Sequence, residues 1–178
     1  MTISIRSAQE IDAPLIARLH FHTWRETYRD LAPQAAFDGV TEEVRLARWQ
    51  NLLASEGSKR VILLAEIDEQ LAGFGMAGPA SHEIFQSRAE IKFLYVGAAF
   101  KRRGVGRKLL LHLARHMMKA GYNGVGLGVV VGNDPAIAFY EGMKGTRAGI
   151  YADPGPVWRS DNYLYVWDNL PDLIGQEL

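Results

Sequence analysis

Residues 90–110, EIKFLYVGAAFKRRGVGRKLL, limit most narrowly what this chain can fold into. An apolar run at 91–96 predicts a strand, and a basic turn with two glycines, Gly104 and Gly106, separates it from an amphipathic helix predicted at 105–120. A glycine turn at a helix start lets backbone N–H groups surround an anion, which the helix dipole also favours. Cations at a helix start are unfavourable by ~0.3–1 kcal/mol each, so a bound phosphate would explain the basic turn. The stretch therefore predicts a phosphate-binding site.

The apolar patterns along the rest of the chain predict a mixed fold. Strands are expected at 3–5, 60–67, 71–77, 89–96, 125–131, 145–151 and 163–167, and helices at 11–29, 41–57, 105–120 and 133–140. Residues 79–88 are expected to form an exposed loop. The order β-α-α-β-β-β-α-β-α-β-β predicts an α/β or α+β fold with few parallel strand pairs.

The composition excludes several kinds of site and disfavours several kinds of partner. At 178 residues the chain is expected to form a single domain over 1–178, with about the last eight residues as a possible tail. Lys+Arg and Asp+Glu are 20 each, so no overall field favours nucleic acid. The absence of cysteine excludes disulfides, thiolate metal sites and a cysteine nucleophile, and no metal site is expected. No basic leader or apolar run of about 18 residues is present, so a cytoplasmic protein without a membrane partner is expected.

Three segments resemble those of one known family. KRRGVG at 101–106 is similar to the pyrophosphate motif Gln/Arg-x-x-Gly-x-Gly/Ala, with Lys101 where Gln or Arg is usual. NDPAIAFYE at 133–141 is similar to Asn-x-x-Ala-x-x-Phe-Tyr, and WRETYRDL at 24–31 is similar to Trp-Arg-x-x-Tyr-Arg-x-Leu. On these segments the chain resembles, over nearly its whole length, the GCN5-related N-acetyltransferase (GNAT) family.

The resemblance implies acetyl-CoA as co-substrate and a mixed, mostly antiparallel central sheet with helices on both faces. It implies that the pyrophosphate lies against the 101–107 turn, and that pantetheine and the acetyl carbonyl meet backbone N–H groups of the preceding strand. The implied cofactor-binding residues are Leu94, Val96, Lys101, Arg102, Arg103, Gly104, Val105, Gly106, Arg107, Asn133, Ala136 and Phe139. Asn133 is also expected as a helix N-cap.

The resemblance further implies direct transfer of an acetyl group to a primary amine in a ternary complex. Tyr140 corresponds to the general acid that protonates the leaving thiolate, since tyrosine keeps its proton at neutral pH. Glu90 corresponds to the catalytic glutamate of the histone-acetylating branch. An alternative, held equally open, is that Glu90 is a solvated strand-end residue and that water relays the proton. Other candidate bases are Glu66, His20 and His22.

In such a fold the first two helices and a late loop border the acceptor side. Aromatic residues in these segments are therefore expected to line the acceptor pocket. Candidates are Trp24, Tyr28, Tyr151 and Trp158, with Phe37 and Tyr163 beside them. The acceptor class stays open between a small-molecule amine and a peptide N-terminus or lysine, and a homodimer is a candidate assembly. Two other functions are a non-catalytic acyl-CoA sensor and a nucleic-acid-binding domain using the basic residues 101–108. The balanced charge disfavours the second.

Overall fold

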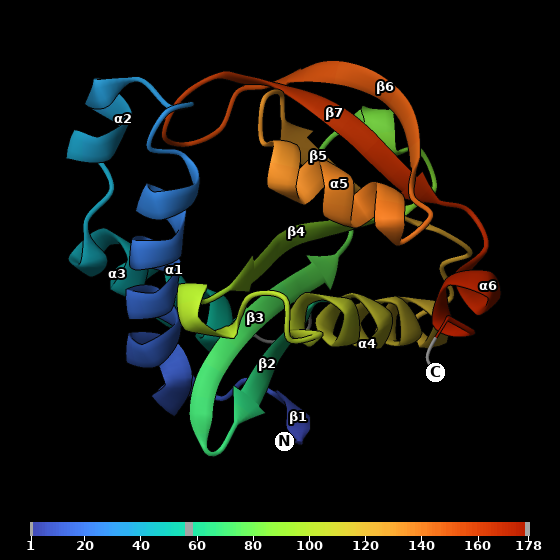
Figure 1. The fold of residues 1–178 in the computed structure, drawn as a ribbon, viewed down its shortest axis with the longest axis horizontal. Helices are drawn as coiled ribbons and strands as arrows, with labels where there is room; N and C mark the ends of the chain where they lie inside the picture. Colours follow the sequence, from blue (N-terminus) through green and yellow to red (C-terminus); the bar gives the residue numbers. More distant parts are fainter. Residues whose placement is uncertain (1, 56–58, 177–178) are drawn as a thin grey trace.

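The computed structural model describes residues 2–55 and 59–176 (Figure 1). The strands are β1 (Ile3–Ser7), β2 (Val61–Ile67), β3 (Gln70–Gly78), β4 (Ala89–Val96), β5 (Val125–Val130), β6 (Thr146–Asp153) and β7 (Ser160–Trp167). The α-helices are α1 (Ala13–Thr27), α2 (Gln34–Asp38), α3 (Glu42–Ala54), α4 (Val105–Lys119), α5 (Asp134–Gly142) and α6 (Leu170–Ile174). The predicted order of strands and long helices is confirmed, and α2 and α6 are additions to it.

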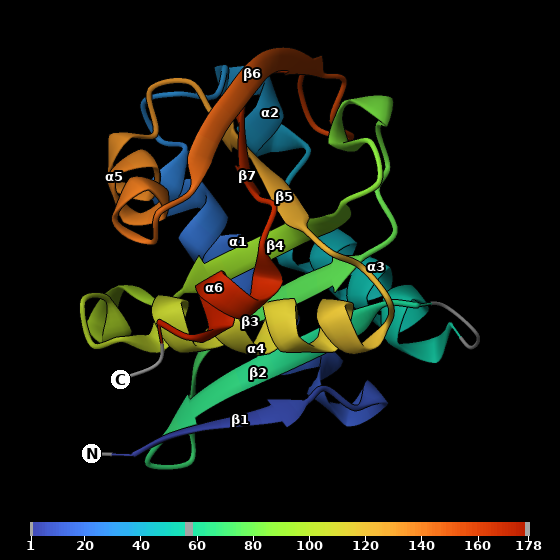
Figure 2. The same ribbon diagram turned by 90° about the vertical axis from the view of Figure 1, so that its right-hand side faces the viewer.

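One seven-stranded sheet runs through the molecule in the order β1-β2-β3-β4-β5-β7-β6. Figure 2 shows the strands rising from β1 to β6. All neighbouring pairs are antiparallel except β4 and β5, which are parallel and joined through α4. The mixed, mostly antiparallel sheet is therefore confirmed, and its one parallel pair lies at its centre.

Helices cover both faces of the sheet, as predicted (Figure 2). On one face α4 packs its apolar side, including Leu109 and Leu113, into the larger core cluster. On the other face α1 and α3 form a second core with Trp49 and Phe74. Gly75 of β3 permits the close approach of α4, because a Cβ atom there would lie 2.7 Å from Leu113 Cδ1. The strand glycines thus mark a tight helix contact rather than a break in the strand.

The ends of the helices on the second face follow from local chemistry. The Thr41 side chain accepts a hydrogen bond from the Val44 N–H and so caps α3, as is typical of threonine at this position. The helix ends at Ala54; its expected end at Gly57 lies outside the described residues. Ile11 and Leu15, near the start of α1, are exposed despite their helical spacing.

Two expected irregular segments are ordered and partly buried. The segment 79–88 contains a short 3₁₀ helix, Glu83–Phe85, whose Phe85 is fully buried against β7. The prediction of an exposed loop there is wrong at Phe85, because the apolar pair Ile84–Phe85 is too short to give a periodic signal. The expected C-terminal tail is also wrong where it is described, because Leu173 of α6 is buried in the α4 core.

A polar junction joins the first strand to the first helix. Arg6 of β1 donates to both Asp12 oxygens at 2.8 Å and to Glu66 Oε1 of β2 at 2.8 Å. Asp12 also accepts from the Gln9 N–H at 2.8 Å. The hydrogen bond from Arg6 lowers the pKa of Asp12, while burial acts in the opposite direction. Glu66, a candidate base from sequence, is therefore a partner in this junction.

No helix within residues 2–55 and 59–176 is long and apolar enough to span a membrane.

Candidate functional site

The centre of the sheet opens because β4 and β5 pair over only two positions. Ala89 pairs with Val125 and Glu90 with Gly126, after which each strand continues without pairing to the other. Figure 1 shows the two strands separating, with α5 above and α4 below the point of separation. The second half of β4 therefore has a free edge on the β5 side.

A bulge at Lys92 sets the direction of the side chains along β4. Met76 of β3 pairs with Phe93 but Ala77 pairs with Ile91, which leaves Lys92 without a partner. Ile91 packs in the α4 core before the bulge and Leu94 after it, whereas Phe93 and Tyr95 face α1 and α3. The extra residue thus turns Tyr95 toward the helices expected to border an acceptor.

The peptide groups of Leu94 and Val96 point toward this free edge. Gly97 N–H donates to Ala72 O at 2.9 Å, so Gly97 directs its peptide groups toward β3. Antiparallel pairing alternates this direction, which turns the N–H groups of Leu94 and Val96 away from β3 and toward the separated β5. The backbone donors expected from sequence therefore lie where no strand uses them.

The start of α4 is open to an anion. Gly104 occupies the N-cap position with φ +86°, a left-handed conformation that favours glycine, and no side chain caps the helix. The first helical hydrogen bond runs from Lys108 N–H to Gly104 O at 3.0 Å. The N–H groups of Val105, Gly106 and Arg107 precede that bond and have no partner within the helix.

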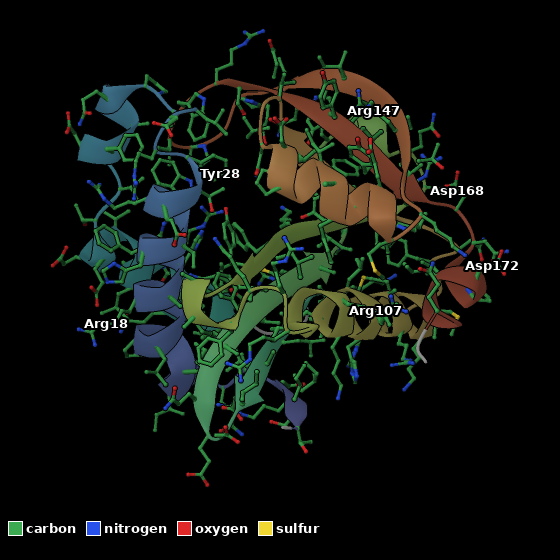
Figure 3. The ribbon with its side chains drawn as sticks, viewed as in Figure 1. Arg18, Tyr28, Arg107, Arg147, Asp168 and Asp172 are labelled. Carbon is green, nitrogen blue, oxygen red and sulfur yellow. The ribbon has the colours of Figure 1, made fainter. Side chains whose placement is uncertain are left out.

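The basic side chains of the turn have separate contacts. Lys101 forms an ion pair with Glu26 of α1 at 3.1 Å, and Arg103 lies over the Phe100 ring at 5.6 Å. Arg107 donates to the backbone oxygen of Gln176, after α6 (Figure 3). Arg102 is exposed and has φ +60°. The predicted phosphate contacts of this turn therefore rest on its backbone, with Arg102 as a nearby cation.

The 133–141 segment forms α5 beside the turn. Phe139 approaches Gly106 so closely that a Cβ atom added at Gly106 would lie 3.4 Å from the Phe139 ring, which places this helix in contact with the turn. Ala136 and Phe139 pack against the α4 core. Asn133 occupies the N-cap position of α5 and is buried, but its side chain makes no capping hydrogen bond. The prediction of a side-chain cap is wrong.

Tyr140 is 8% exposed and packs beside Tyr165 and Trp167, each about 6.1 Å away between ring centroids. Burial raises the pKa of Tyr140 well above its usual range, with a smaller contribution from Tyr95. Its hydroxyl therefore keeps its proton throughout the neutral range. The interaction with Tyr95 links α5 to the free half of β4.

Glu90 holds the loop that precedes its strand. Its Oε2 accepts hydrogen bonds from both the N–H and the Oγ of Ser81, each at 2.7 Å. Tyr151 lies nearby: its ring is 5.3 Å from that of His82, and burial raises the pKa of Tyr151 to about 12, with Asp153 and Glu90 adding smaller effects. Five residues of strand span roughly 15 Å, which separates Glu90 from Tyr95. Glu90 and Tyr151 thus form one group at the paired end of β4, apart from Tyr95.

The other predicted acceptor residues form a second group. Trp24 and Tyr28 at the end of α1 each contact Trp158 of the β6–β7 loop, at 5.6 and 5.4 Å between ring centroids. Tyr95 packs against the same cluster, and Figure 3 shows Tyr28 at the end of α1 nearest α5. Phe37 joins through Trp24 at 5.2 Å, whereas Tyr163 lies under Arg147 instead.

The two histidines of α1 do not join these groups as bases. His20 is 1% exposed and its Nδ1 accepts from Trp49 Nε1 at 3.1 Å. Burial lowers the pKa of His20 well below its ordinary value, so it is a neutral core residue. His22 lines an open groove of about 670 Å³ on the outer side of α1 and α2. Of the predicted acceptor residues, only Phe37 lines that groove.

Sequence patterns alone did not point to Arg45 and Arg48 of α3. Arg45 is 4% exposed and its Nε has no hydrogen-bond partner, although burying a cation costs several kcal/mol. Arg48 is half-buried over the Phe93 ring, at 5.1 Å from its centroid. A signal was present, because Arg45 precedes Trp49 and Leu52 by four and seven residues and so lies on the apolar stripe of the helix.

No cluster of three or more histidines and carboxylates arranged to hold a metal ion occurs in the described part of the chain. The fold and the site together define a mixed α/β protein whose uncapped helix start and free strand edge, where two parallel strands separate, have a geometry suited to a phosphate-containing cofactor.

Comparison with known proteins identifies the family. Residues 21–144 match the model of the acetyltransferase (GNAT) family. The chain therefore belongs to the GNAT family of acetyltransferases, whose co-substrate is acetyl-CoA.

Relatives and solved structures agree with this assignment. The uncharacterized N-acetyltransferase YuaI of Bacillus subtilis is 26% identical over 82% of this chain and 81% of its own length. The PaiA N-acetyltransferase of Thermoplasma acidophilum, solved in complex with coenzyme A, has a TM-score of 0.66 at 20% identity over 94% of this chain and 99% of that one. YncA of Salmonella typhimurium, a putative acetyltransferase solved with acetyl-CoA, has a TM-score of 0.68 at 22% identity and covers 94% of each chain. The structural likenesses show that the fold is shared.

Proposed function

We propose that the protein transfers the acetyl group of acetyl-CoA directly to a primary amine, with both substrates bound at once. The observation that carries this proposal is the free edge of β4, where the N–H groups of Leu94 and Val96 point to the side from which β5 has separated, near the uncapped start of α4. Tyr140 belongs to the same core cluster as Leu94 and Val96. Donors for a phosphate, donors for a carbonyl and a protonated phenol thus border one region.

The residues present fit acetyl-CoA. The N–H groups of Val105, Gly106 and Arg107 would hold the pyrophosphate, with Arg102 and Arg103 as nearby cations. The Leu94 and Val96 N–H groups would bind the pantetheine and the acetyl carbonyl, and Phe139 would line the same side. Acetyl-CoA supplies an activated acetyl group as a thioester. A preorganised backbone donor aimed at a developing oxyanion is worth ~2.7–4 kcal/mol of barrier.

Tyr140 serves as the proton donor in this proposal. Its buried hydroxyl remains protonated and offers an O–H to the sulfur, which gains negative charge as the carbon–sulfur bond breaks. Solvent then returns the proton.

Glu90 serves as a proton acceptor only through water. Its carboxylate is held by Ser81 and lies roughly 15 Å along β4 from Tyr95, too far for a direct contact with an amine bound beside Tyr95. A chain of waters would carry the proton lost by the amine toward Glu90 or into bulk solvent. Direct transfer follows from the need to bring the amine to the bound thioester without a cysteine intermediate.

The test combines a binding measurement with a turnover measurement. Acetyl-CoA affinity is measured by calorimetry, and CoA release is followed with a panel of amines, polyamines, amino acids and peptides. Gly104→Val should weaken acetyl-CoA binding at least tenfold, because a β-branched residue strains a backbone held at φ +86°.

Gly121→Val is the matched control. Gly121 also has a left-handed φ of +94°, but it follows the other end of α4 and has open surroundings. This variant should lose stability yet retain acetyl-CoA affinity. An unchanged dissociation constant in Gly104→Val would contradict the phosphate site. Tight acetyl-CoA binding without turnover of any amine would favour the non-catalytic acyl-CoA sensor.

A further inference from the structure

Two arginines of α3 lie on the acceptor side of the sheet without an acidic partner. Arg45 is 4% exposed and its Nε has no hydrogen-bond partner. Neither Arg45 nor Arg48 forms an ion pair with a carboxylate within residues 2–55 and 59–176. Arg48, three residues further along α3, adds a second positive charge on the same side and repels the first.

The groups around Arg45 do not neutralise its charge. Its guanidinium carbon lies 5.7 Å from the Trp24 ring centroid, and Tyr28 and Tyr95 interact with it through their phenols. Burial raises the pKa of both tyrosines, so the phenols are uncharged at neutral pH. His20, the neighbouring titratable group of α1, is also neutral. A buried cation in such surroundings is suited to an anion brought by a ligand.

We propose that Arg45 and Arg48 bind a carboxylate of the acceptor, so that the amine acetylated by this protein is an amino acid. This inference rests on the proposed acetyl transfer and specifies its acceptor. The carboxylate lies against α3, the amine reaches toward Tyr140, and the side chain lies among the rings of Trp24, Tyr28 and Trp158.

The geometry of the site favours one small molecule that carries both groups. Arg45 lies over Trp24, which packs in one aromatic cluster with Tyr28 and Tyr95, and Tyr95 belongs to the free half of β4 that borders the proposed acetyl site. An acceptor whose amine and carboxylate belong to one small molecule fits between this cluster and that edge. The apolar rings favour an uncharged side chain.

A carboxylate matches the site better than a phosphate. Two carboxylate oxygens match the planar fork of a guanidinium, and one negative charge suits a site in which only Arg45 is deeply buried. A phosphate would bring a further oxygen and a further charge into surroundings whose other donors are two phenols. Phosphorylated amines are therefore a contrary outcome of the test.

The experiment compares acceptors with and without the carboxylate. Initial rates of CoA release are measured with the twenty standard L-amino acids and with the carboxamide of each one accepted. An α-amino amide has the less basic amine, so more of it is neutral, and chemistry alone would make it the faster substrate. We expect the wild type to prefer the acid by on the order of 100-fold in kcat/KM.

Variants of α3 then assign that preference to the arginines. Arg45→Met should lower kcat/KM for the acid on the order of 100-fold, leave that for the amide within about threefold, and leave or raise the melting temperature. Arg48→Met should act in the same direction with a smaller effect. The matched control is Arg18→Met, at an exposed position of α1, which should change neither substrate.

A binding measurement detects the carboxylate site even when CoA release is too slow to measure. With CoA present, 3-phenylpropionate should change the tryptophan fluorescence of the wild type saturably, since Trp24 borders Arg45 and contacts Trp158, and the change should be lost in Arg45→Met.

Equal rates with acids and amides, preference for phosphorylated amines, or no carboxylate binding would each overturn the inference. A loss of stability in Arg45→Met with equal effects on acid and amide would make the arginine structural. Turnover of simple amines in those cases would leave the proposed acetyl transfer intact, whereas failure to bind acetyl-CoA would reject that function itself.

Discussion

At the scale of single residues, three tyrosines from distant parts of the sequence keep their protons around the proposed site. Tyr28 follows α1 and packs in one cluster with Tyr95, which lies after the β4 bulge, while Tyr140 belongs to α5. Burial raises the pKa of each, so all three remain protonated in the neutral range. Of the three, Tyr140 belongs to the helix on whose side the proposed leaving sulfur would lie.

Replacing Tyr140 with Phe tests its role as proton donor. We expect kcat to fall about 100-fold with little change in acetyl-CoA affinity, because the ring is kept and only the hydroxyl is lost. The measurement is pre-steady-state CoA release together with calorimetric binding. Tyr165→Phe is the comparison, since its hydroxyl contacts Glu141 and Arg147 outside the proposed site. Unchanged chemistry in Tyr140→Phe would remove it as the acid.

Two variants distinguish proton transfer by Glu90 from its role in anchoring the loop that precedes β4. Glu90→Gln should lower kcat/KM about tenfold if a water chain ends at this carboxylate, because the amide cannot take up the proton. Ser81→Ala removes one of the two bonds that hold Glu90 and keeps the carboxylate, so it should retain most activity. Equal losses in the two variants would assign Glu90 to loop structure alone, and the pH dependence of kcat/KM would then be the same as in the wild type.

At the scale of elements, the junction of β1, the start of α1 and β2 depends on Arg6. We expect Arg6→Gln to destabilise the fold by about 1–3 kcal/mol at pH 7, because Asp12 would stay buried without its cation. The folded-state pKa of Asp12 is lowered from 3.8, so its contribution is complete above that value and is lost as the pH falls below it. The two proteins should therefore converge in stability under acid.

Urea denaturation at several pH values measures this difference. Arg18→Gln is the control, because the Arg18–Glu42 ion pair is exposed and 3.9 Å long and contributes little. A stability difference that does not depend on pH would contradict the role of Asp12.

Some of these elements could be predicted from the sequence and others could not. Strands and long helices were predictable because the spacing of their apolar residues indicates which face is buried. The 101–106 turn was predictable because its glycines indicate a backbone conformation that other residues rarely adopt. Phe85 and α6 were not, since short segments give too few positions for a period. The role of Arg45 could not be predicted, because it depends on which face of α3 packs inward. Arg45 lies on the apolar stripe of that helix, whereas arginine is usually exposed.

At the scale of the whole molecule, the two parts of the sheet are joined by one pair of strands, β4 and β5, which pair at only two positions. β1–β4 with α1, α3 and α4 form one part, and β5–β7 with α5 form the other (Figure 1). A ligand that contacts both the start of α4 and Phe139 of α5 would hold the parts together. Cofactor binding should therefore affect stability far from the site.

We expect acetyl-CoA at about 100 times its dissociation constant to stabilise the protein by about 2.7 kcal/mol, or about 5–10 °C in melting temperature. Hydrogen exchange should slow in β5 and β7 as well as at Leu94 and Val96, because the β4 edge becomes covered. Gly104→Val should show both changes more weakly at the same concentration, with a stabilisation of at most about 1.4 kcal/mol for a loss of affinity of tenfold or more. Protection confined to the 101–107 turn would contradict a ligand that spans both parts.

The bulge at Lys92 has a consequence for how this chain should be aligned and edited. Deleting Lys92 would restore a regular ladder and leave every later residue of β4 on its present face, because Ile91 and Phe93 would become neighbours that point to opposite sides. A relative with one residue fewer between the positions of Glu90 and Gly104 would therefore present the same side chains to its acceptor when the gap in the alignment is placed at Lys92. A relative of equal length that lacks the bulge would instead turn the residue at the position of Tyr95 toward α4, even with every motif unchanged.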